Sequence, residues 1–398
     1  MNAQKSAVCF LGDAQMSKET MTSRQRMVAT LNRKPVDRYP IDLGVHFSTG
    51  ISAFAYYNLR RALGLSCDNI ELAEPSLFLA RVDEDVRRRF HIDTILLNPP
   101  FVRTKKWSPR AGYSFVVPDG FNPEQDSEGR WVIHRPDLTL IMAANGYHFD
   151  GGWIDYYGCG DDFDAKLAIF AKSAERIYKE TDYFTMMMGF SGYFHGLEFA
   201  CDMLTDPDYS AEINSNILKA EIEKVGKLIN AVGDYIDAIE VNSDLGTQQS
   251  LLCTPQSYQD LVAPYLKKFI DFVHQNSDYK VYMHSCGAIS ELIPILIQCG
   301  VDALNPVQVS AKGMDLETLK SRFGNDIVFW GGGCDTQNVL GTANPETVAE
   351  HTRKMAGILK RGGGFVFSQV HNIQGDVPPE NIIAMLDEAY NSSFYGEQ

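Results

Sequence analysis

Three side chains able to bind a soft metal ion stand where two apolar runs of the sequence end. His284 ends the run "YKVYMH", Cys286 follows two residues later, and Cys334 follows the run "DIVFWGGG". One imidazole and two thiolates form a set suited to zinc, with bonds of about 2.0–2.3 Å. Because three protein ligands leave one coordination position open, such a set is typical of a catalytic metal centre.

Spacing alone also allows the interpretation that these residues bind no metal ion. The pattern His-x-Cys is common by chance, and a cysteine after three glycines can simply fit a tight turn. The gap between Cys286 and Cys334 is unlike the paired cysteines of a zinc finger. The chain has eight cysteines without a disulfide framework, so most of them read as small buried residues, for example Cys201, Cys253 and Cys299.

Helical and strand-like segments alternate along the chain, which predicts where these residues lie. Helical periodicity is found at residues 20–33, 52–64, 74–90, 163–178, 210–235, 256–275, 288–299, 345–361 and 379–390. Apolar runs rich in β-branched residues lie at 39–45, 93–98, 183–188, 236–242, 279–284, 301–306, 326–332 and 364–370. Eight runs with helices between them predict an α/β fold, a closed parallel (β/α)8 barrel of the TIM type. Chemistry in such barrels sits where strands end, which is the place of His284, Cys286 and Cys334.

Residues 101–155 interrupt this alternation and read as β-hairpins. We therefore expect one domain over residues 1–398 with a β-rich insertion at 101–155, which we call the flap. The flap either covers the barrel mouth and selects an apolar or aromatic compound, or packs away from the mouth. It is rich in aromatic residues: Phe101, Trp107, Tyr113, Phe115, Phe121, Trp131, Tyr147, Phe149 and Trp153.

Composition narrows the classes of partner. The 398 residues are 44% hydrophobic and 22% charged, as in ordinary globular proteins, and the net charge is -15 with a pI near 5.0. Such a chain repels polyanions, and its one basic cluster, "VRRRF" at 86–90, reads as a helix end, so we expect no nucleic acid partner. No apolar run approaches the roughly 18–20 residues of a membrane span, and no signal peptide core is found, so we expect no membrane association and a cytoplasmic location.

The metal-binding pattern carries a family resemblance. The segments "HSCG" (His284, Cys286) and "GGGCDTQ" (Cys334) resemble the metal motif of zinc-dependent, corrinoid-linked methyltransferases within the uroporphyrinogen decarboxylase superfamily. Further resemblance lies in "RQRMVATLNRKPVDRYPID" at 24–42, in residues 244–273 and in "HNIQGDVPPENIIAMLDEAY" at 371–390. The resemblance implies a TIM-type barrel and a zinc ion held by His284, Cys286 and Cys334.

The same comparison separates two chemistries. Uroporphyrinogen decarboxylases hold the propionates of their substrate with an arginine-rich stretch after the first strand, whereas this chain has "PIDLGVHFSTG" and no arginine between Arg38 and Arg60. The resemblance therefore favours methyl transfer between a small methyl compound, such as a methoxylated aromatic, or a thiol and the cobalt of a corrinoid (cobalamin). The chain lacks an Asp-x-His-x-x-Gly corrinoid motif, so the corrinoid is expected on a partner protein.

Two other classes of function stay open: a metal-free decarboxylase of the uroporphyrinogen type, and a binding module with a purely structural zinc. Among further candidate site residues, Asp244 could be a fourth zinc ligand or contact substrate, and His46 could orient substrate. Glu240 lies in the strand before Asp244, and Gln369 and His371 end the last apolar run, although the residues after them also read as a helix entry. A homo-oligomer is compatible with the sequence.

Overall fold

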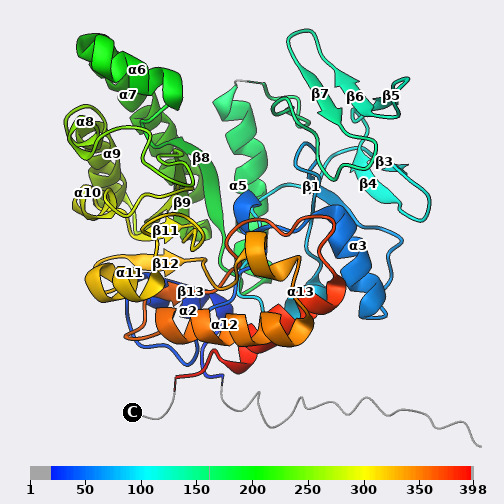
Figure 1. Ribbon diagram of the computed structural model, residues 1–398. Helices are drawn as coiled ribbons and strands as arrows, with labels where there is room; N and C mark the ends of the chain where they lie inside the picture. Colours follow the sequence, from blue (N-terminus) through cyan, green and yellow to red (C-terminus); the bar gives the residue numbers. More distant parts are fainter. Residues whose placement is uncertain (1–18, 161, 396–398) are drawn as a thin grey trace, which may run out of the picture.

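Six parallel strands form the centre of the computed structural model, which describes residues 19–160 and 162–395 (Figure 1). Each strand pairs with the next one along the chain. They are β8 (Met186–Ser191), β9 (Ala238–Asn242), β10 (Lys280–His284), β11 (Ala303–Asn305), β12 (Val328–Trp330) and β13 (Phe365–Val366).

Two shorter segments close this sheet into a barrel. Ile41 forms a parallel bridge with Phe367, just after β13, and Thr94 forms one with Phe184, just before β8. The two segments also meet each other, because the N–H of Asp93 donates to the carbonyl of Ile41 at 2.8 Å. The ring thus has eight members, and the predicted TIM-type (β/α)8 barrel is confirmed.

Helices connect and surround the strands. Their apolar residues recur with helical period: α9 buries Leu266, Phe269, Ile270 and Val273. The helices are α2 (Ser23–Leu31), α3 (Ala53–Ala62), α4 (Glu84–Arg89), α5 (Phe163–Glu180), α6 (Leu197–Thr205), α7 (Pro207–Val232), α8 (Pro255–Leu261), α9 (Ala263–Asn276), α10 (Ile293–Cys299), α11 (Leu316–Phe323), α12 (Pro345–Leu359) and α13 (Pro379–Asn391).

The prediction of a helix at 74–90 is wrong for the first half of that range. Residues there form a short antiparallel pair, β1 (Leu72–Glu74) with β2 (Leu79–Ala80), and only α4 is helical. The Glu74 carboxylate accepts the N–H groups of Ser76 and Leu77, and Phe78 has a φ of +56°. These local bonds give the backbone a turn in place of a helix.

The barrel floor is packed with apolar side chains. Met186, Tyr282, Trp330 and Val366 belong to one buried cluster, and the indole N–H of Trp330 donates to the buried carboxylate of Asp42 at 2.9 Å. Side chains alternate along a strand, so His284 points the same way as Tyr282, one layer nearer the barrel mouth.

The flap consists of two small antiparallel sheets. One is the hairpin of β3 (Thr104–Trp107) with β4 (Phe115–Pro118), and the other joins β5 (Glu124–Gln125), β6 (Trp131–His134) and β7 (Thr139–Met142) (Figure 1). Its inner face packs on the barrel side: the ring of Phe115 lies 5.3 Å from that of Phe54 in α3 and 5.1 Å from that of Phe78. Much of the aromatic content therefore anchors the flap.

The flap also touches the loop that follows β13. Gly375 of this loop lies so close to Tyr147 of the flap that a Cβ at position 375 would overlap the tyrosine ring. The same loop is tied to the segment before α3, since Ile51 bridges Ile373 and the N–H of Ser52 donates to the carbonyl of Ile373 at 2.8 Å. The loop after β13 is thus held from two sides.

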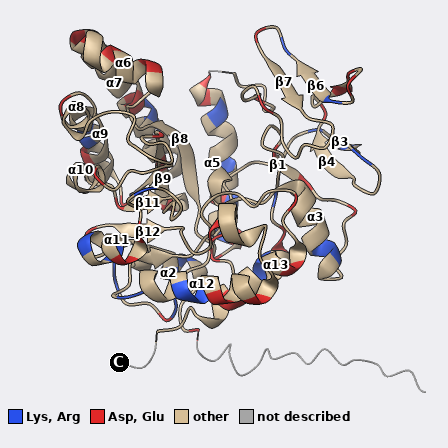
Figure 2. Ribbon diagram, in the orientation of Figure 1, with Lys and Arg blue, Asp and Glu red and all other residues tan. Residues whose placement is uncertain are grey.

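Lys, Arg, Asp and Glu are spread over the outer helices (Figure 2). Within residues 19–160 and 162–395, no helix combines the length and apolarity needed to cross a bilayer.

Candidate metal centre at the barrel mouth

The carboxyl ends of several strands bring together polar side chains. His284 is the last residue of β10, and Asn305 is the last residue of β11. Asp244 lies two residues after β9, and His371 lies in the loop after β13. Parallel strands end on one side of a barrel, so these residues meet at its mouth.

His284, Cys286 and His371 form the core of the site. Their ligand atoms all lie within 4.8 Å of one another, and no other set of three His, Cys, Asp or Glu side chains in the described residues does so. The Sγ of Cys286 lies 3.6 Å from Nε2 of His284, and the two imidazole rings are 6.3 Å apart. Two imidazole nitrogens and a sulfur are a donor set that zinc accepts, and the residues therefore fit that metal.

Asparagine amides select the nitrogen that each histidine offers. Nδ1 of His284 contacts Oδ1 of Asn305 at 2.9 Å, and the Nδ2 group of Asn305 donates to the carbonyl of Trp330 at 3.0 Å. Nδ1 of His371 contacts Oδ1 of Asn372 at 2.6 Å. Because an amide oxygen only accepts, both Nδ1 atoms carry the proton, and both Nε2 lone pairs are left for a metal ion.

Burial sets the protonation of the cluster. Burial, together with the neighbouring His46, lowers the pKa of His284 to about 4, and burial also lowers the pKa of His371. Both imidazoles are thus neutral near pH 7, which is the form that ligates. Burial and the nearby Asp244 carboxylate raise the pKa of Cys286 to about 12, so this thiol would lose its proton when a metal ion binds.

Asp244 and Gly287 hold the turn that carries Cys286. The N–H of Cys286 donates to Oδ1 of Asp244 at 2.9 Å, and the same oxygen lies 3.9 Å from Nε2 of His284. Gly287 has a φ of +99°, and a Cβ there would overlap the backbone of Gly246. The turn needs glycine for both reasons. The Asp244 side chain is 61% exposed, so it faces the open side of the site.

Cys334, the predicted third ligand, lies outside this group in the structure. Its side chain is fully buried in the apolar core, beside Thr352 of α12, and burial raises its pKa to about 12. Gly331 and Gly332 have φ values of +104° and +77°, which turn the chain after β12. Cys334 therefore faces α12, and His371 is the third side chain of the group around His284 and Cys286.

His46 and Glu240 form a buried pair next to the cluster. Nε2 of His46 lies 3.3 Å from Oε1 of Glu240, and Oε2 of Glu240 accepts the N–H of Gly189 at 2.7 Å. Although burial opposes ionisation, these bonds lower the pKa of Glu240 below its usual value. The His46 ring lies 5.0 Å from that of His284, so the pair adjoins the candidate metal ligands.

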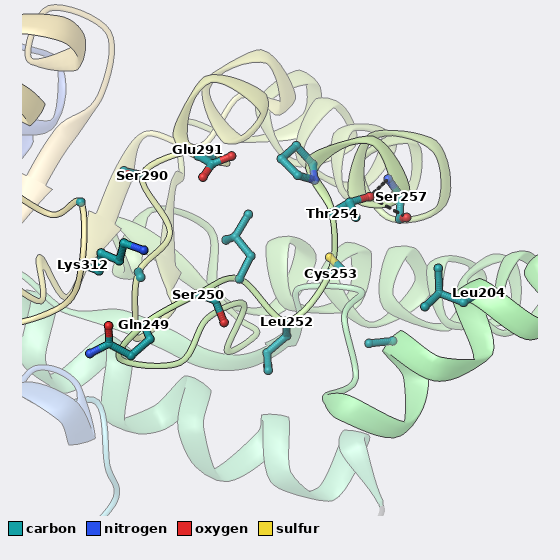
Figure 3. A pocket seen from close by; sticks show the side chains of 15 residues that line it. Leu204, Gln249, Ser250, Leu252, Cys253, Thr254, Ser257, Ser290, Glu291 and Lys312 are labelled. Atoms are coloured by element: carbon teal, nitrogen blue, oxygen red, sulfur yellow. Dashed lines mark hydrogen bonds between the residues drawn. The ribbon is translucent and has the colours of Figure 1, made fainter.

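Two cavities lie near the mouth. One, of about 740 Å³, lies between the flap, α5 and β8. The other, of about 580 Å³, begins beside the turn that carries Cys286. Figure 3 shows this second cavity with Glu291 and Lys312 toward one end and Leu204 of α6 at the other.

Comparison with known proteins identifies the family. Residues 167–392, more than half of the chain, match the family model described as uroporphyrinogen decarboxylase (URO-D). The chain belongs to the URO-D family. The range that matches the URO-D family includes Asp244, His284, Cys286 and His371, so the candidate site lies inside the part that the family shares.

Individual members of the URO-D family are distant. The uroporphyrinogen decarboxylase of Legionella pneumophila (strain Corby) is 22% identical over 378 residues, which are 91% of this chain and 95% of that protein. The one of Pseudoalteromonas atlantica is 25% identical over 179 residues, and the match spans 47% of its length. A solved methyltransferase from Methanosarcina mazei superposes with a TM-score of 0.57 at 14% identity, covering 93% of this chain and 99% of that one. At such identity the likeness shows the fold alone.

The sequence pattern had placed His371 at the end of the last strand without making it a ligand. The signal that could have found it is the dipeptide His371-Asn372 at a strand end, where an amide beside an imidazole can fix its tautomer. Asn305 had no such signal, because its contact with His284 joins two strands.

Proposed function

We propose that this URO-D family member is a zinc-dependent methyltransferase that moves a methyl group between a small methyl compound or a thiol and the cobalt of a corrinoid protein. The observation that carries the proposal is the cluster of His284, Cys286 and His371, with Nδ1 of both histidines held by asparagine amides, which leaves Nε2 free to bind a metal ion. A set of three ligands is typical of catalytic zinc sites, whereas structural zinc usually has four.

Zinc bound there would act as a Lewis acid on the oxygen of a methyl donor or would lower the pKa of an acceptor thiol. The residues of the chain supply the rest. Asn305 and Asn372 orient the imidazoles, and the exposed Asp244 can contact a substrate or complete the ligand set. Glu240 orients His46 so that its ring forms one wall beside His284.

The transfer from an ether balances as follows. The methyl carbon would form a bond to the cobalt of the supplied corrinoid, and the electron pair for this bond would come from Co(I), which would become Co(III). The bond from that carbon to oxygen would break, its electron pair would stay on the oxygen, and the oxygen would take up one proton. Activity therefore requires a strong reductant, anaerobic handling and a supplied corrinoid, because the chain has no corrinoid motif of its own.

A partner that carries the corrinoid has to reach the mouth, and the surface beside it offers apolar side chains. On α6, Leu197 is 65% exposed and Leu204 is 74% exposed. Leu204 also lines the cavity that begins beside the Cys286 turn. Exposed apolar residues that cluster around a site are typical of protein contacts.

The experiment that tests the proposal is the visible spectrum of Co(I) cobalamin incubated with the protein. The panel contains methoxyaromatics, methanol, methylamines and methyl thiols, followed by the reverse reaction with thiol acceptors. We expect the spectrum of methyl-cobalamin with one class of donor, and loss of that change in a Cys286→Ser variant.

The second candidate is a metal-free decarboxylase, which the names of the relatives from Legionella pneumophila and Pseudoalteromonas atlantica favour. The missing arginines between Arg38 and Arg60 speak against it. No spectral change with any donor, together with release of carbon dioxide from a carboxylated tetrapyrrole, would replace the methyltransferase proposal with this one. Zinc retained in a protein without either activity would favour the binding module.

A further inference from the structure

The cavity between the flap and the barrel has aromatic walls. Its volume of about 740 Å³ is in the range of sites that bind small molecules. Phe47 lies in the loop after the barrel segment that contains Ile41, and Trp153 belongs to the flap. Their rings stack at the edge of the cavity with centroids 5.8 Å apart and planes at 20°. Trp153 is 60% exposed, so much of its ring is left uncovered by protein. A flat ring entering the cavity would find an apolar surface to lie against.

This cavity borders the candidate metal centre. Phe47 follows His46 directly, and Gly189, another lining residue, donates its N–H to Glu240, the partner of His46. The His46 ring in turn lies 5.0 Å from that of His284. One layer of side chains thus separates the aromatic walls from the metal-binding cluster.

Two cations also line the cavity, and neither forms an ion pair within 4.0 Å with any described residue. Arg135 of the flap donates to the carbonyls of Gly120 and His134 at 2.9 and 3.2 Å, which fix its guanidinium without neutralising it. Lys166 comes from the first turns of α5. In a chain of net charge -15, two cations without acidic partners at one cavity indicate an anionic ligand.

The acidic residues of the cavity are mostly engaged elsewhere. Asp155 accepts the N–H groups of Tyr157, Cys159 and Gly160 at 2.6–2.8 Å. Glu74 accepts two backbone N–H groups, and burial raises its pKa to about 7. Asp137 is an exposed lining residue without a hydrogen bond or ion pair to described residues, so of the three lining carboxylates it would oppose an anion most directly.

We infer that this cavity binds the methyl donor as an aromatic ring with an anionic substituent, the ring against Phe47 and Trp153 and the anion between Arg135 and Lys166. The inference rests on the proposed function only in calling the bound compound a methyl donor. The binding itself requires neither metal nor corrinoid.

Calorimetric titration of the full chain tests the inference with three probes: methoxybenzoate, methoxybenzene and methoxycyclohexane carboxylate. We expect methoxybenzoate to bind most tightly, because it alone has both the ring and the anion. Lys166→Gln and Arg135→Gln should each weaken methoxybenzoate about tenfold and leave methoxybenzene unchanged. Trp153→Leu should weaken both aromatic probes about tenfold.

Lys172→Gln is the matched control, because Lys172 lies on the same helix and does not line the cavity; it should change nothing. Equal binding of all three probes, or equal losses in the Lys172 and Lys166 variants, would overturn the inference. Binding of the aromatic probes with this pattern but without methyl transfer would support the inferred binding site and contradict the proposed methyltransferase function. Methyl transfer from methanol or methylamines without binding of any aromatic probe would do the reverse.

Discussion

Asn372 is the residue on which the orientation of His371 depends. Its Oδ1 contacts Nδ1 of His371 at 2.6 Å and accepts from the Gln374 amide at 2.9 Å, so one oxygen organises the loop around the imidazole. Such outer contacts typically contribute a 10- to 100-fold factor to metal affinity.

Replacing Asn372 by Ala should therefore weaken zinc binding about 10- to 100-fold, because the His371 ring loses its fixed tautomer and direction. Asn372→Asp keeps an acceptor oxygen for Nδ1 and should retain most of the affinity. Competition with a chromophoric chelator measures both constants. Equal affinity in the Ala variant and the unchanged protein would show that the His371 ring needs no such support.

The metal content of variants tests whether His371 or Cys334 is the third zinc ligand. The unchanged protein should hold about one zinc per chain, and His371→Ala should lose most of it, since a ligand is removed. Cys334→Ser should keep its zinc, because this side chain lies in the core against α12. Elemental analysis after dialysis measures the zinc content of each variant. Loss of zinc in Cys334→Ser alone would show that the ligands are His284, Cys286 and Cys334, as the motif predicts.

At the scale of elements, strand order was predictable and side-chain direction after the strands was not. All eight apolar runs became barrel strands or bridges, because strands of a parallel barrel are buried on both faces and read as continuous apolar segments. His284 and Cys286 were found because their positions follow directly from β10. The structure does not bring Cys334 to the same group, because two glycines with positive φ turn the chain after β12, which spacing does not record.

The sequence pattern also failed to predict some short elements. The helix expected at 74–90 gave way to β1 and β2, where the Glu74 carboxylate caps a turn that helical periodicity does not reveal. Helix α6 was missed because it is short and its exposed residues Leu197 and Leu204 obscure the buried face formed by Phe199, Ala200 and Met203.

The segment entering β9 contains a titrating group with a defined effect on stability. Burial raises the pKa of Asp237 from 3.8 to about 6, although Arg24 lies 3.6 Å away. The folded chain thus holds a proton that the unfolded chain has released between about pH 4 and pH 6. The contribution of Asp237 to stability is fully present below pH 4 and is lost as the pH rises through 6, by up to about 3 kcal/mol.

Asp237→Asn should remove this loss. The variant should be more stable than the unchanged protein at pH 7.5, by up to about 3 kcal/mol, and the difference should vanish near pH 4. Guanidinium unfolding of both proteins between pH 4 and 7.5 measures this difference in the free energy of unfolding. A difference independent of pH would mean that the folded state holds no additional proton at Asp237.

For the whole molecule, the open question is how a corrinoid on a second protein meets the barrel mouth. Leu204→Asp places a charge on the exposed face of α6 and should slow methyl transfer with a protein-bound corrinoid about tenfold or more, because apolar contact is replaced. Transfer with free cobalamin should be unchanged, since the substitution lies outside the metal centre.

Val102→Asp is the control for that experiment, because Val102 is 96% exposed but belongs to the flap. It should affect neither reaction. If both variants slow the protein-bound reaction equally, added negative charge is the cause and α6 is not the contact surface.

The close fit of Tyr147 on Gly375 limits how this barrel could be remodelled. The ring takes up the space that a Cβ at position 375 would need, so the flap and the loop carrying His371 are sterically matched to each other. A flap transplanted onto another barrel of this family would clash unless the recipient loop also has glycine at that position. Exchange of substrate preference between relatives by recombination should therefore succeed only when both segments are inherited as a pair.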